Sequence, residues 1–184
     1  MSFNEQKSVY FVTTTCKHHH HYFETDEVKH ILCNAILNCN ALHDADLIGY
    51  VIMPNHIHLL LRIRNRDKLI KYMHSLKTYA SAAVRHTLIL RDPVNALILA
   101  YHRKRQTYKV WEDGYHWKEV FSTEFLIQKL DYIHRNPLQE KWKMVERAED
   151  YLYSSAGFYM TGLRGVMEVV HFNRYFEPEV KWIK

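Results

Sequence analysis

Two histidines, His56 and His58, are separated by one residue within the apolar, strand-like segment 54–61. In a β-strand successive side chains point to opposite faces of the sheet, so the two imidazoles share one face. Ile57 and Leu59 then lie on the other face, which can pack into a core. Because burying two imidazoles without partners is costly, the histidine face must be hydrated, hydrogen-bonded or coordinated to a metal ion.

A second pair of side chains that can do chemistry lies on a predicted helix in the C-terminal half. This helix is expected to begin with Ser122 or Thr123 as its cap and to end at Asn136, because Pro137 disfavours helical geometry in the residue before it. At about 100° per residue, Tyr132 and Asn136 stack one turn apart on the same flank. A hydroxyl and an amide therefore project together, although an ordinary half-buried tyrosine fits the same pattern.

The composition predicts one globular domain. The chain has 184 residues and is 47% apolar, which is ample for a sizeable core. We expect no membrane span, since no stretch approaches the roughly 18 uninterrupted apolar residues that one needs. The N-terminus lacks the features of a signal peptide, so a cytoplasmic location is expected. The odd number of cysteines at spacings unlike zinc motifs predicts reduced thiols; they are Cys16, Cys33 and Cys39.

Hydrophobic periodicity predicts an α+β fold. The order strand, helix, strand, strand, helix, strand indicates a ferredoxin-like, RRM-like antiparallel sheet with two helices on one face. The helix that carries Tyr132 is separate from these two, and the opposite face of the sheet is expected to stay available for a ligand. The predicted elements are strands 9–15, 47–53 and 56–63, helices 25–39 and 67–84, and short strands 108–111 and 116–121.

The charge of the chain favours a polyanionic partner. The formal net charge is +5 and the pI is near 9.0, which is compatible with DNA, RNA or an acidic membrane. The run Arg103-Lys104-Arg105 lies between Tyr101 and Trp111, an interleaving of cations and rings that is typical of nucleic-acid binding. A solvated loop explains the same run equally well.

Several motifs together resemble a known family. The segments are Gly49–Leu60, Trp111–Tyr115, Asp131–Leu138 and Glu149–Ala156. In this order and at these separations they are similar to the REP-associated tyrosine transposases, which are single-tyrosine HUH transposases of insertion sequences. The resemblance covers roughly residues 8 to 160, and the combination is more specific than any one segment.

The resemblance implies a site and a reaction. His56 and His58 would be ligands of a divalent metal ion, Mg²⁺ or Mn²⁺, and Asn136 would supply or support a third ligand. Tyr132 would be the nucleophile that attacks a DNA phosphodiester and forms a covalent 5′-phosphotyrosine. The implied substrate is single-stranded or hairpin DNA, and the implied activity is cleavage and rejoining of strands. His134 is turned about 160° from Tyr132 on the helix and is not expected to take part.

Candidate contacts to DNA phosphates lie on the second predicted helix and in the basic run. The predicted contacts are Lys68, Lys71, Lys77, Arg103, Lys104, Arg105 and, as a stacking platform, Trp111. For each of these residues the alternative is that the cations only solubilise the surface and that the aromatic ring is part of the core. The resemblance to the REP-associated group implies a monomer rather than a homodimer, and no exposed apolar seam decides between the two.

Two alternatives to a transposase follow from the same residues. A histidine-triad nucleotide hydrolase also places alternating histidines on a strand, but the third alternate position here is Leu60. A DNA-binding protein retained by the host, with a vestigial site, is the non-enzymatic alternative. The intact set of His56, His58, Tyr132 and Asn136 argues against it.

The domain boundaries follow from the extent of the motifs. Residues 1–160 are expected to form the DNA-cleaving domain, and residues 161–184 a C-terminal tail that packs on it. Residues 168–172 are expected to form a late strand within this tail. The segment 87–107 gives no clear pattern.

Overall fold

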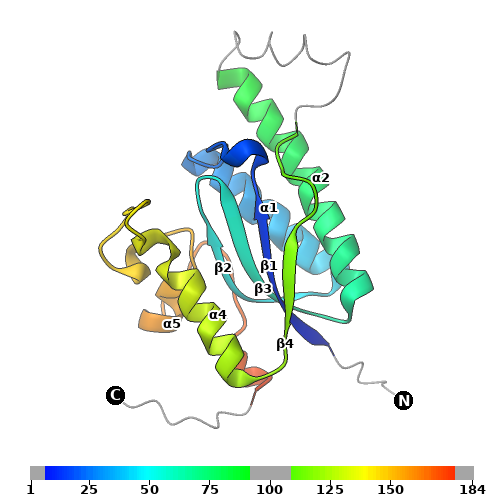
Figure 1. Ribbon diagram of the computed structural model, residues 1–184, viewed down its shortest axis with the longest axis vertical. Coiled ribbons are helices and arrows are strands. Elements are labelled where there is room, and N and C mark those ends of the chain that lie inside the picture. The colour runs from blue at the N-terminus through cyan, green and yellow to red at the C-terminus, as the bar shows by residue number, and fades with distance from the viewer. Residues whose placement is uncertain (1–6, 92–108, 177–184) are drawn as a thin grey trace.

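The computed structural model describes residues 7–91 and 109–176. Four strands form one antiparallel sheet in the order β2-β3-β1-β4, as Figure 1 shows. With one helix after β1 and another after β3, this order is the ferredoxin-like arrangement that the sequence predicts. The strands are β1 Ser8–Thr15, β2 Asp46–Ile52, β3 His56–Ile63 and β4 His116–Val120.

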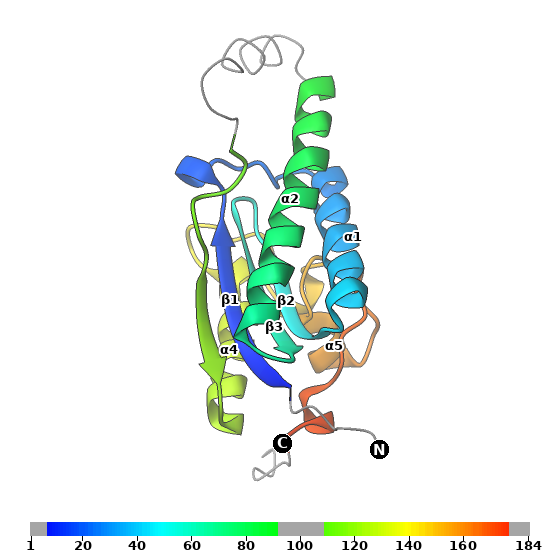
Figure 2. The ribbon, with the colours of Figure 1, turned by 90° about the vertical axis from the view of Figure 1, so that its right-hand side faces the viewer.

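Helices lie on both faces of the sheet (Figures 1 and 2). Helices α1 (Asp26–His43) and α2 (Arg66–Arg91) pack on each other and cover one face, as expected. Helix α4 (Thr123–Arg135) packs on the opposite face against β2 and β3. The prediction that this second face stays free is therefore correct only at the β4 side, where His116 and Lys118, the residues that share this face with Thr13 and Phe11, are exposed.

The helix ends follow from local chemistry. The Thr25 hydroxyl accepts a hydrogen bond from an amide in the first turn of α1, and Ser122 does the same for α4 at 3.2 Å. Each cap satisfies one amide that the helix itself leaves unpaired. Helix α4 ends at Arg135, one residue before the expected end, and Asn136 begins a 3-10 turn that contains Pro137.

The two faces of β3 differ as the alternation of its side chains predicts. Ile57, Leu59 and Leu61 are almost completely buried beneath α1 and α2, where each leucine contributes about 1.5–3 kcal/mol of hydrophobic stabilisation. His56 and His58 lie on the α4 side of the sheet. The pairing of β1 with β3 is in regular register throughout, which fixes both imidazoles on a rigid element.

Gly49 on β2 allows α4 to approach the sheet closely. A Cβ atom at this position would lie 2.6 Å from Cδ2 of Leu130 on α4, which is shorter than van der Waals contact allows. A larger residue at this position would therefore require the side chain of Leu130 to move.

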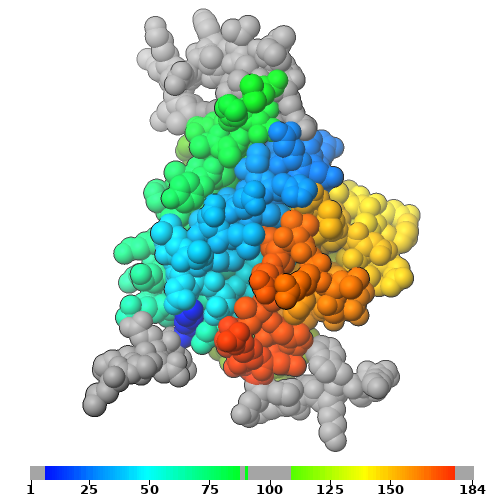
Figure 3. Space-filling view, turned by 180° about the vertical axis from the view of Figure 1, so that it is seen from behind, coloured from blue at the N-terminus to red at the C-terminus, as the bar shows by residue number. Residues whose placement is uncertain are grey.

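The C-terminal segment covers the β2 edge of the sheet. Backbone bonds run from Ile52 N to Tyr153 O at 2.9 Å and from Ser155 N to Tyr50 O at 3.0 Å. Helix α5 (Ala156–Thr161) follows, and the segment lies beside α1 in the view of Figure 3. Covering an edge strand in this way protects its unpaired backbone groups.

The late strand predicted for residues 168–172 is absent from this described segment. Val170 N donates one hydrogen bond to Leu47 O at 2.8 Å, but the neighbouring residues form no ladder, and a 3-10 turn begins at Phe172. The prediction was wrong because the apolar residues of this segment are buried by packing on the β2 edge, without strand pairing.

The region between α2 and β4 also differs from expectation. The part of the predicted strand 108–111 that the structure describes contains only an isolated bridge between Cys16 and Trp111. The predicted cations Arg103, Lys104 and Arg105 lie outside the described residues. Cys16, Cys33 and Cys39 are free and buried. None of the described helices has the length and hydropathy of a membrane span.

Candidate active site

Each of the two histidines of β3 has a polar partner at Nδ1 of its ring. His58 Nδ1 lies 2.7 Å from the hydroxyl of Thr13, its direct partner on β1. His56 Nδ1 lies 2.7 Å from Oδ1 of Asn55. The two rings are 4.8 Å apart between centroids and nearly perpendicular. A second partner at Nδ1 fixes the orientation of an imidazole and leaves Nε2 to face the site, as in many metal centres.

The tautomer of His56 follows from its partners. Asn55 donates from Nδ2 to the carbonyl of His19 at 3.3 Å, so its Oδ1 faces His56 and accepts a hydrogen bond. Nδ1 of His56 must then carry the proton, and Nε2 must carry a lone pair. The sequence placed Asn55 only in the turn before β3, whereas the structure gives it a direct role in orienting His56.

Asn136 brings a third donor atom to the same place. Its Nδ2 donates to the carbonyl of Tyr132 at 2.8 Å, so its Oδ1 is the atom that lies 3.2 Å from Nε2 of His56. Both atoms carry lone pairs, and two such atoms in contact repel each other unless they share a cation. Adjacent ligands of an octahedral ion with bonds of about 2.1 Å lie about 3 Å apart. The arrangement therefore fits a bound metal ion.

His58 contributes a ring nitrogen without a hydrogen-bond partner to this site. Its Nε2 is buried and has no hydrogen-bond partner among the described residues. Burial lowers the pKa of His58 to about 3 and that of His56 to about 4. The amide of Asn136 raises both pKa values by a smaller amount. Both imidazoles are thus neutral near pH 7, which is the form that coordinates metals.

The donor set consists of two imidazole nitrogens and one amide oxygen. Within residues 7–91 and 109–176, no three histidine, cysteine, aspartate or glutamate side chains converge to hold a metal. A site with these neutral donors leaves the full charge on the ion and keeps coordination positions open. Imidazole favours manganese over magnesium, whereas the amide oxygen suits both.

Tyr132 lies at the edge of this donor set. Its ring centroid is 5.1 Å from that of His58 and 5.9 Å from that of Phe11, in edge-to-face contacts. The side chain is 44% exposed. The tyrosine thus combines a fixed ring beside the imidazoles with access to solvent, which is what an attack on a bound polymer requires.

His134 occupies a different environment, although it is on the same helix as Tyr132. It is buried, and its Nε2 lies 2.9 Å from the hydroxyl of Ser155. Burial lowers its pKa to about 4. Its contacts join α4 to the C-terminal segment, in agreement with the prediction that it faces away from Tyr132.

Trp142 forms a wall of the site that sequence reasoning missed. Its ring centroid is 5.9 Å from that of His56 and 5.4 Å from that of His21. Thr13 and Asn55 were missed as well. Asn55 could have been noticed because it directly precedes His56, but Thr13 and Trp142 are distant in sequence from the two histidines, and only the register of β1 and the path of the chain after Asn136 bring them here.

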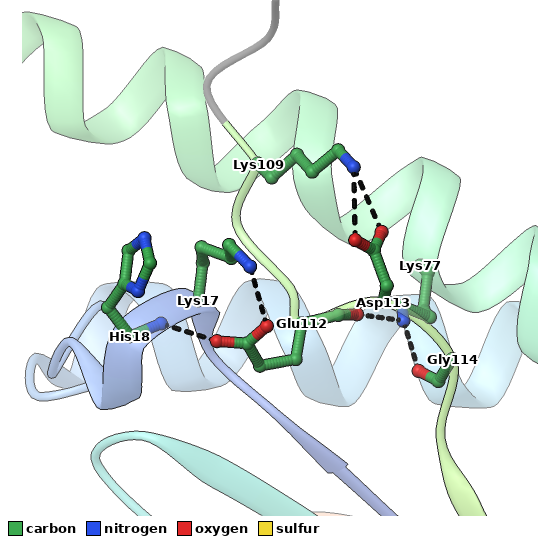
Figure 4. Close-up of polar contacts among 7 residues, drawn as sticks. All are labelled: Lys17, His18, Lys77, Lys109, Glu112, Asp113 and Gly114. Atoms are coloured by element: carbon green, nitrogen blue, oxygen red, sulfur yellow. Dashed lines mark hydrogen bonds and ion pairs between the residues drawn. The ribbon is translucent and has the colours of Figure 1, made fainter.

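The lysines predicted as DNA contacts on α2 lie in the helical layer on the other side of the sheet. They are not brought together with Tyr132. The ammonium of Lys77 donates to the carbonyls of Glu112 and Gly114 at 2.7 and 2.6 Å, as Figure 4 shows. Lys68, Lys71 and Lys77 remain predictions as DNA contacts.

Trp111 is only 4% exposed and packs on Phe23. A stacking platform needs an exposed ring face, so this burial argues against the predicted role of Trp111. The ring instead belongs to the core, which is the alternative that the sequence left open.

The contacts in Figure 4 have a structural role. Glu112 pairs with the ammonium of Lys17 at 2.7 Å and accepts from the amide of His18. These contacts lower the pKa of the Glu112 carboxyl to about 2. They fasten the segment that enters β4 to the loop that follows β1, on the side of the sheet away from α4.

Comparisons with known proteins bear on the family and the fold of this chain. The sequence profile of the family described as "Transposase IS200 like" matches residues 5–136. The solved structure of a REP-associated tyrosine transposase bound to a REP hairpin has a TM-score of 0.63 and 14% identity, covering 92% of this chain and 89% of that one. A Deinococcus radiodurans R1 protein described as a transposase has a TM-score of 0.49 and 18% identity, covering 73% and 95%. No curated protein sequence matched.

Proposed function

Because the chain belongs to the IS200-like transposase family, we propose that it cleaves and rejoins single-stranded or hairpin DNA with Tyr132 as the nucleophile. One observation carries this proposal. The exposed tyrosine ring contacts the ring of His58, and the lone pairs of His56 and Asn136 face each other at 3.2 Å in the same place. The proposed nucleophile thus lies next to the residues proposed to hold the cation.

The metal dependence of the reaction rests on the donor set. His56, His58 and Asn136 would hold a divalent cation, Mg²⁺ or Mn²⁺. Such an ion supplies a Lewis acid that polarises a nonbridging oxygen of the scissile phosphate. The contacts of Thr13 and Asn55 with Nδ1 of the two imidazoles would orient Nε2 of each ring toward such an ion.

The covalent step uses the hydroxyl of Tyr132. Its oxygen attacks the phosphorus, a bond forms between them, and the bond from phosphorus to the 3′ oxygen breaks. The phenolic proton passes to solvent, which reaches this exposed side chain, and the departing 3′ oxygen takes up a proton. The products are a 5′-phosphotyrosine and a free 3′-hydroxyl, so the energy of the phosphodiester is retained for rejoining.

The choice of DNA as the partner rests on the fold and the charge. The structurally similar transposase was solved with a REP hairpin, and this chain has a net charge of +5. A single strand or a hairpin end gives the tyrosine access to a bendable backbone. We further propose that it acts as a monomer, which the resemblance to the REP-associated transposases implies.

The test is the formation of a covalent adduct. The protein is incubated with a labelled hairpin oligonucleotide that carries a single-stranded flank, in Mn²⁺ or Mg²⁺, and denatured samples are separated by electrophoresis. We expect an adduct that withstands denaturant, disappears with chelator and falls by on the order of 10³-fold or more in Tyr132→Phe. Tyr79→Phe is the matched control, since Tyr79 is 53% exposed on α2, and should leave the adduct unchanged.

Other outcomes discriminate between the alternatives. An adduct that persists in Tyr132→Phe would assign the nucleophile to another tyrosine and contradict the proposal. Specific DNA binding with no adduct under any metal condition would favour a host-retained DNA-binding protein. Hydrolysis of a nucleotide without DNA would favour the histidine-triad alternative, which the burial of Leu60 does not support.

A further inference from the structure

The exposed part of the α4 side of the sheet begins directly beside Tyr132. On β4, Lys118 pairs in register with Phe11 of β1, and Phe11 contacts both His58 and Tyr132. Alternation along β4 therefore places Lys118 on the same face of the sheet as the candidate active site. This surface has none of the lysines that the sequence predicted as DNA contacts.

Lys129 lies one turn before Tyr132 on α4 and points its ammonium at the same surface. The Nζ atom is 5.1 Å from the ring centroid of Phe11, 4.9 Å from that of Phe125 and 5.9 Å from that of Tyr132. No carboxylate pairs with it within the part of the chain that the structure describes. Burial and the charge of Lys118 lower the pKa of Lys129, so an anion that lies between the two lysines would relieve their repulsion.

A hollow next to these lysines is lined by aromatic rings. It has a volume of about 540 Å³ and is lined by Lys118, Glu119, Phe121 and Phe125. Phe121 is 84% exposed, and its ring is 6.0 Å from that of Phe125 at an angle of 30°. A large aromatic side chain that is exposed to this extent stabilises no core, but offers a free face on which a base can stack.

We propose that this surface binds the DNA strand next to the scissile phosphate. Lys118 and Lys129 hold a neighbouring backbone phosphate, and a base of that strand stacks on Phe121 in the hollow. The occupant is single-stranded, since a base inside a duplex has no free face to offer. This inference rests on the proposed function, and it places the DNA path along β4 and the first half of α4.

The acidic groups near this surface do not cancel its charge. Asp131 pairs with Arg135 at 2.9 Å. Glu119 lines the hollow, but its pairing with Tyr10 places it on the alternate face of β4. Glu124 lies in the first turn of α4, where the carboxylate interacts with the helix N-terminus. Neither Lys118 nor Lys129 forms an ion pair with a carboxylate among the described residues, and Nζ of Lys129 lies 5.9 Å from the ring centroid of Tyr132.

The test measures binding in the absence of metal, so that cleavage cannot contribute. A fluorescein-labelled single-stranded oligonucleotide is titrated with the protein in chelator at several salt concentrations, and anisotropy is recorded. The double variant Lys118→Gln/Lys129→Gln should reduce the slope of log K against log salt by about 0.7 for each phosphate that is no longer neutralised. Phe121→Ala should weaken binding about tenfold at every salt concentration, with little change in slope.

Matched variants separate this surface from general effects. Lys129→Arg and Phe121→Trp should keep binding close to that of the unmodified protein, since each keeps the charge or the ring. Arg164→Gln and Tyr79→Ala alter an exposed cation and an exposed aromatic residue elsewhere and should have no effect. Thermal unfolding of each variant shows whether it is folded.

The possible results bear on different statements. This inference would be overturned if Lys118→Gln/Lys129→Gln and Phe121→Ala bound DNA as well as the two control variants. That result would leave the proposed function intact. Failure of the unmodified protein to bind any single-stranded or hairpin DNA would overturn both. The inference would also be contradicted if these variants lost binding to duplex DNA but kept their binding to single-stranded DNA. Stacking on Phe121 requires an unpaired base.

Discussion

The two faces of the sheet are covered to different extents. On one face α1 and α2 bury the β3 side chains beneath them, and Ile57, Leu59 and Leu61 are at most 1% exposed. On the other face α4 packs mainly on β2 and β3 and touches Phe11 of β1, and the β4 residues on this face, His116 and Lys118, are exposed. The candidate active site lies at this border between the covered and exposed parts of the second face.

The difference between the faces separates two requirements of the site. Donor atoms need a rigid and largely dry environment, which the buried part of the second face provides for His58. A nucleophile that attacks a polymer needs access to solvent, which the exposed part provides for Tyr132. The covered first face supplies the hydrophobic burial that keeps the sheet rigid. If chemistry and stability divide between the faces in this way, substitutions on each face should have separate effects.

The largest effect on activity is expected for His58→Ala. Removing one of the donor atoms should reduce adduct formation by on the order of 10³-fold or more, because the charge stabilisation in the transition state is lost. DNA binding in chelator should change little, since phosphate contacts elsewhere supply the affinity. His74→Ala, an exposed histidine on α2, is the control. Full adduct formation by His58→Ala would exclude this metal site.

The neighbouring residue on the other face should behave in the opposite way. Leu59→Ala creates a cavity beneath α1 and α2 and should lower the free energy of unfolding by about 2–5 kcal/mol. Urea denaturation followed by circular dichroism measures this change. At a temperature where the variant is folded, its rate of adduct formation should stay within about threefold of the unmodified rate. A large loss of activity in the folded variant would show that the faces are not independent.

A smaller loss of activity is expected when only the orientation of His58 is disturbed. Thr13→Val removes the hydroxyl that lies 2.7 Å from Nδ1 of His58, and loss of such an outer partner costs about 10–100-fold in metal affinity or activity. The concentration of Mn²⁺ that gives half-maximal adduct formation should rise. Thr13→Ser keeps the hydroxyl and should behave like the unmodified protein. Equal half-maximal Mn²⁺ concentrations for Thr13→Val and Thr13→Ser would contradict the proposed role of Thr13 in orienting His58.

The smallest effect is expected for the lysines of α2. Lys71→Gln should change the salt dependence of DNA binding less than Lys118→Gln does, because Lys71 lies in the helical layer on the covered face. The same anisotropy titration measures both variants. If Lys71→Gln has the larger effect, the strand runs over α2, as the sequence alone predicted, and the path along β4 is wrong.

The sequence predicted the parts of the site that depend on local periodicity. The alternation around His56 and His58 was sufficient to place both on one face of a strand, and helical spacing placed Asn136 one turn after Tyr132. The roles of these residues remain proposals. The DNA contacts were chosen from basic residues on a helix surface, and helical periodicity does not state on which side of a sheet that helix packs.

The sequence by itself determined the order of the elements and the ferredoxin-like sheet, because these depend on local periodicity, and it determined the family through the order and spacing of short motifs along the chain. Only the tertiary structure decided that Thr13 orients His58, that Tyr132 packs beside it and that Lys118 and Lys129 meet on one surface. These contacts join residues that are distant in sequence. They arise from strand register and from the close packing of α4 at Gly49, which no local pattern encodes.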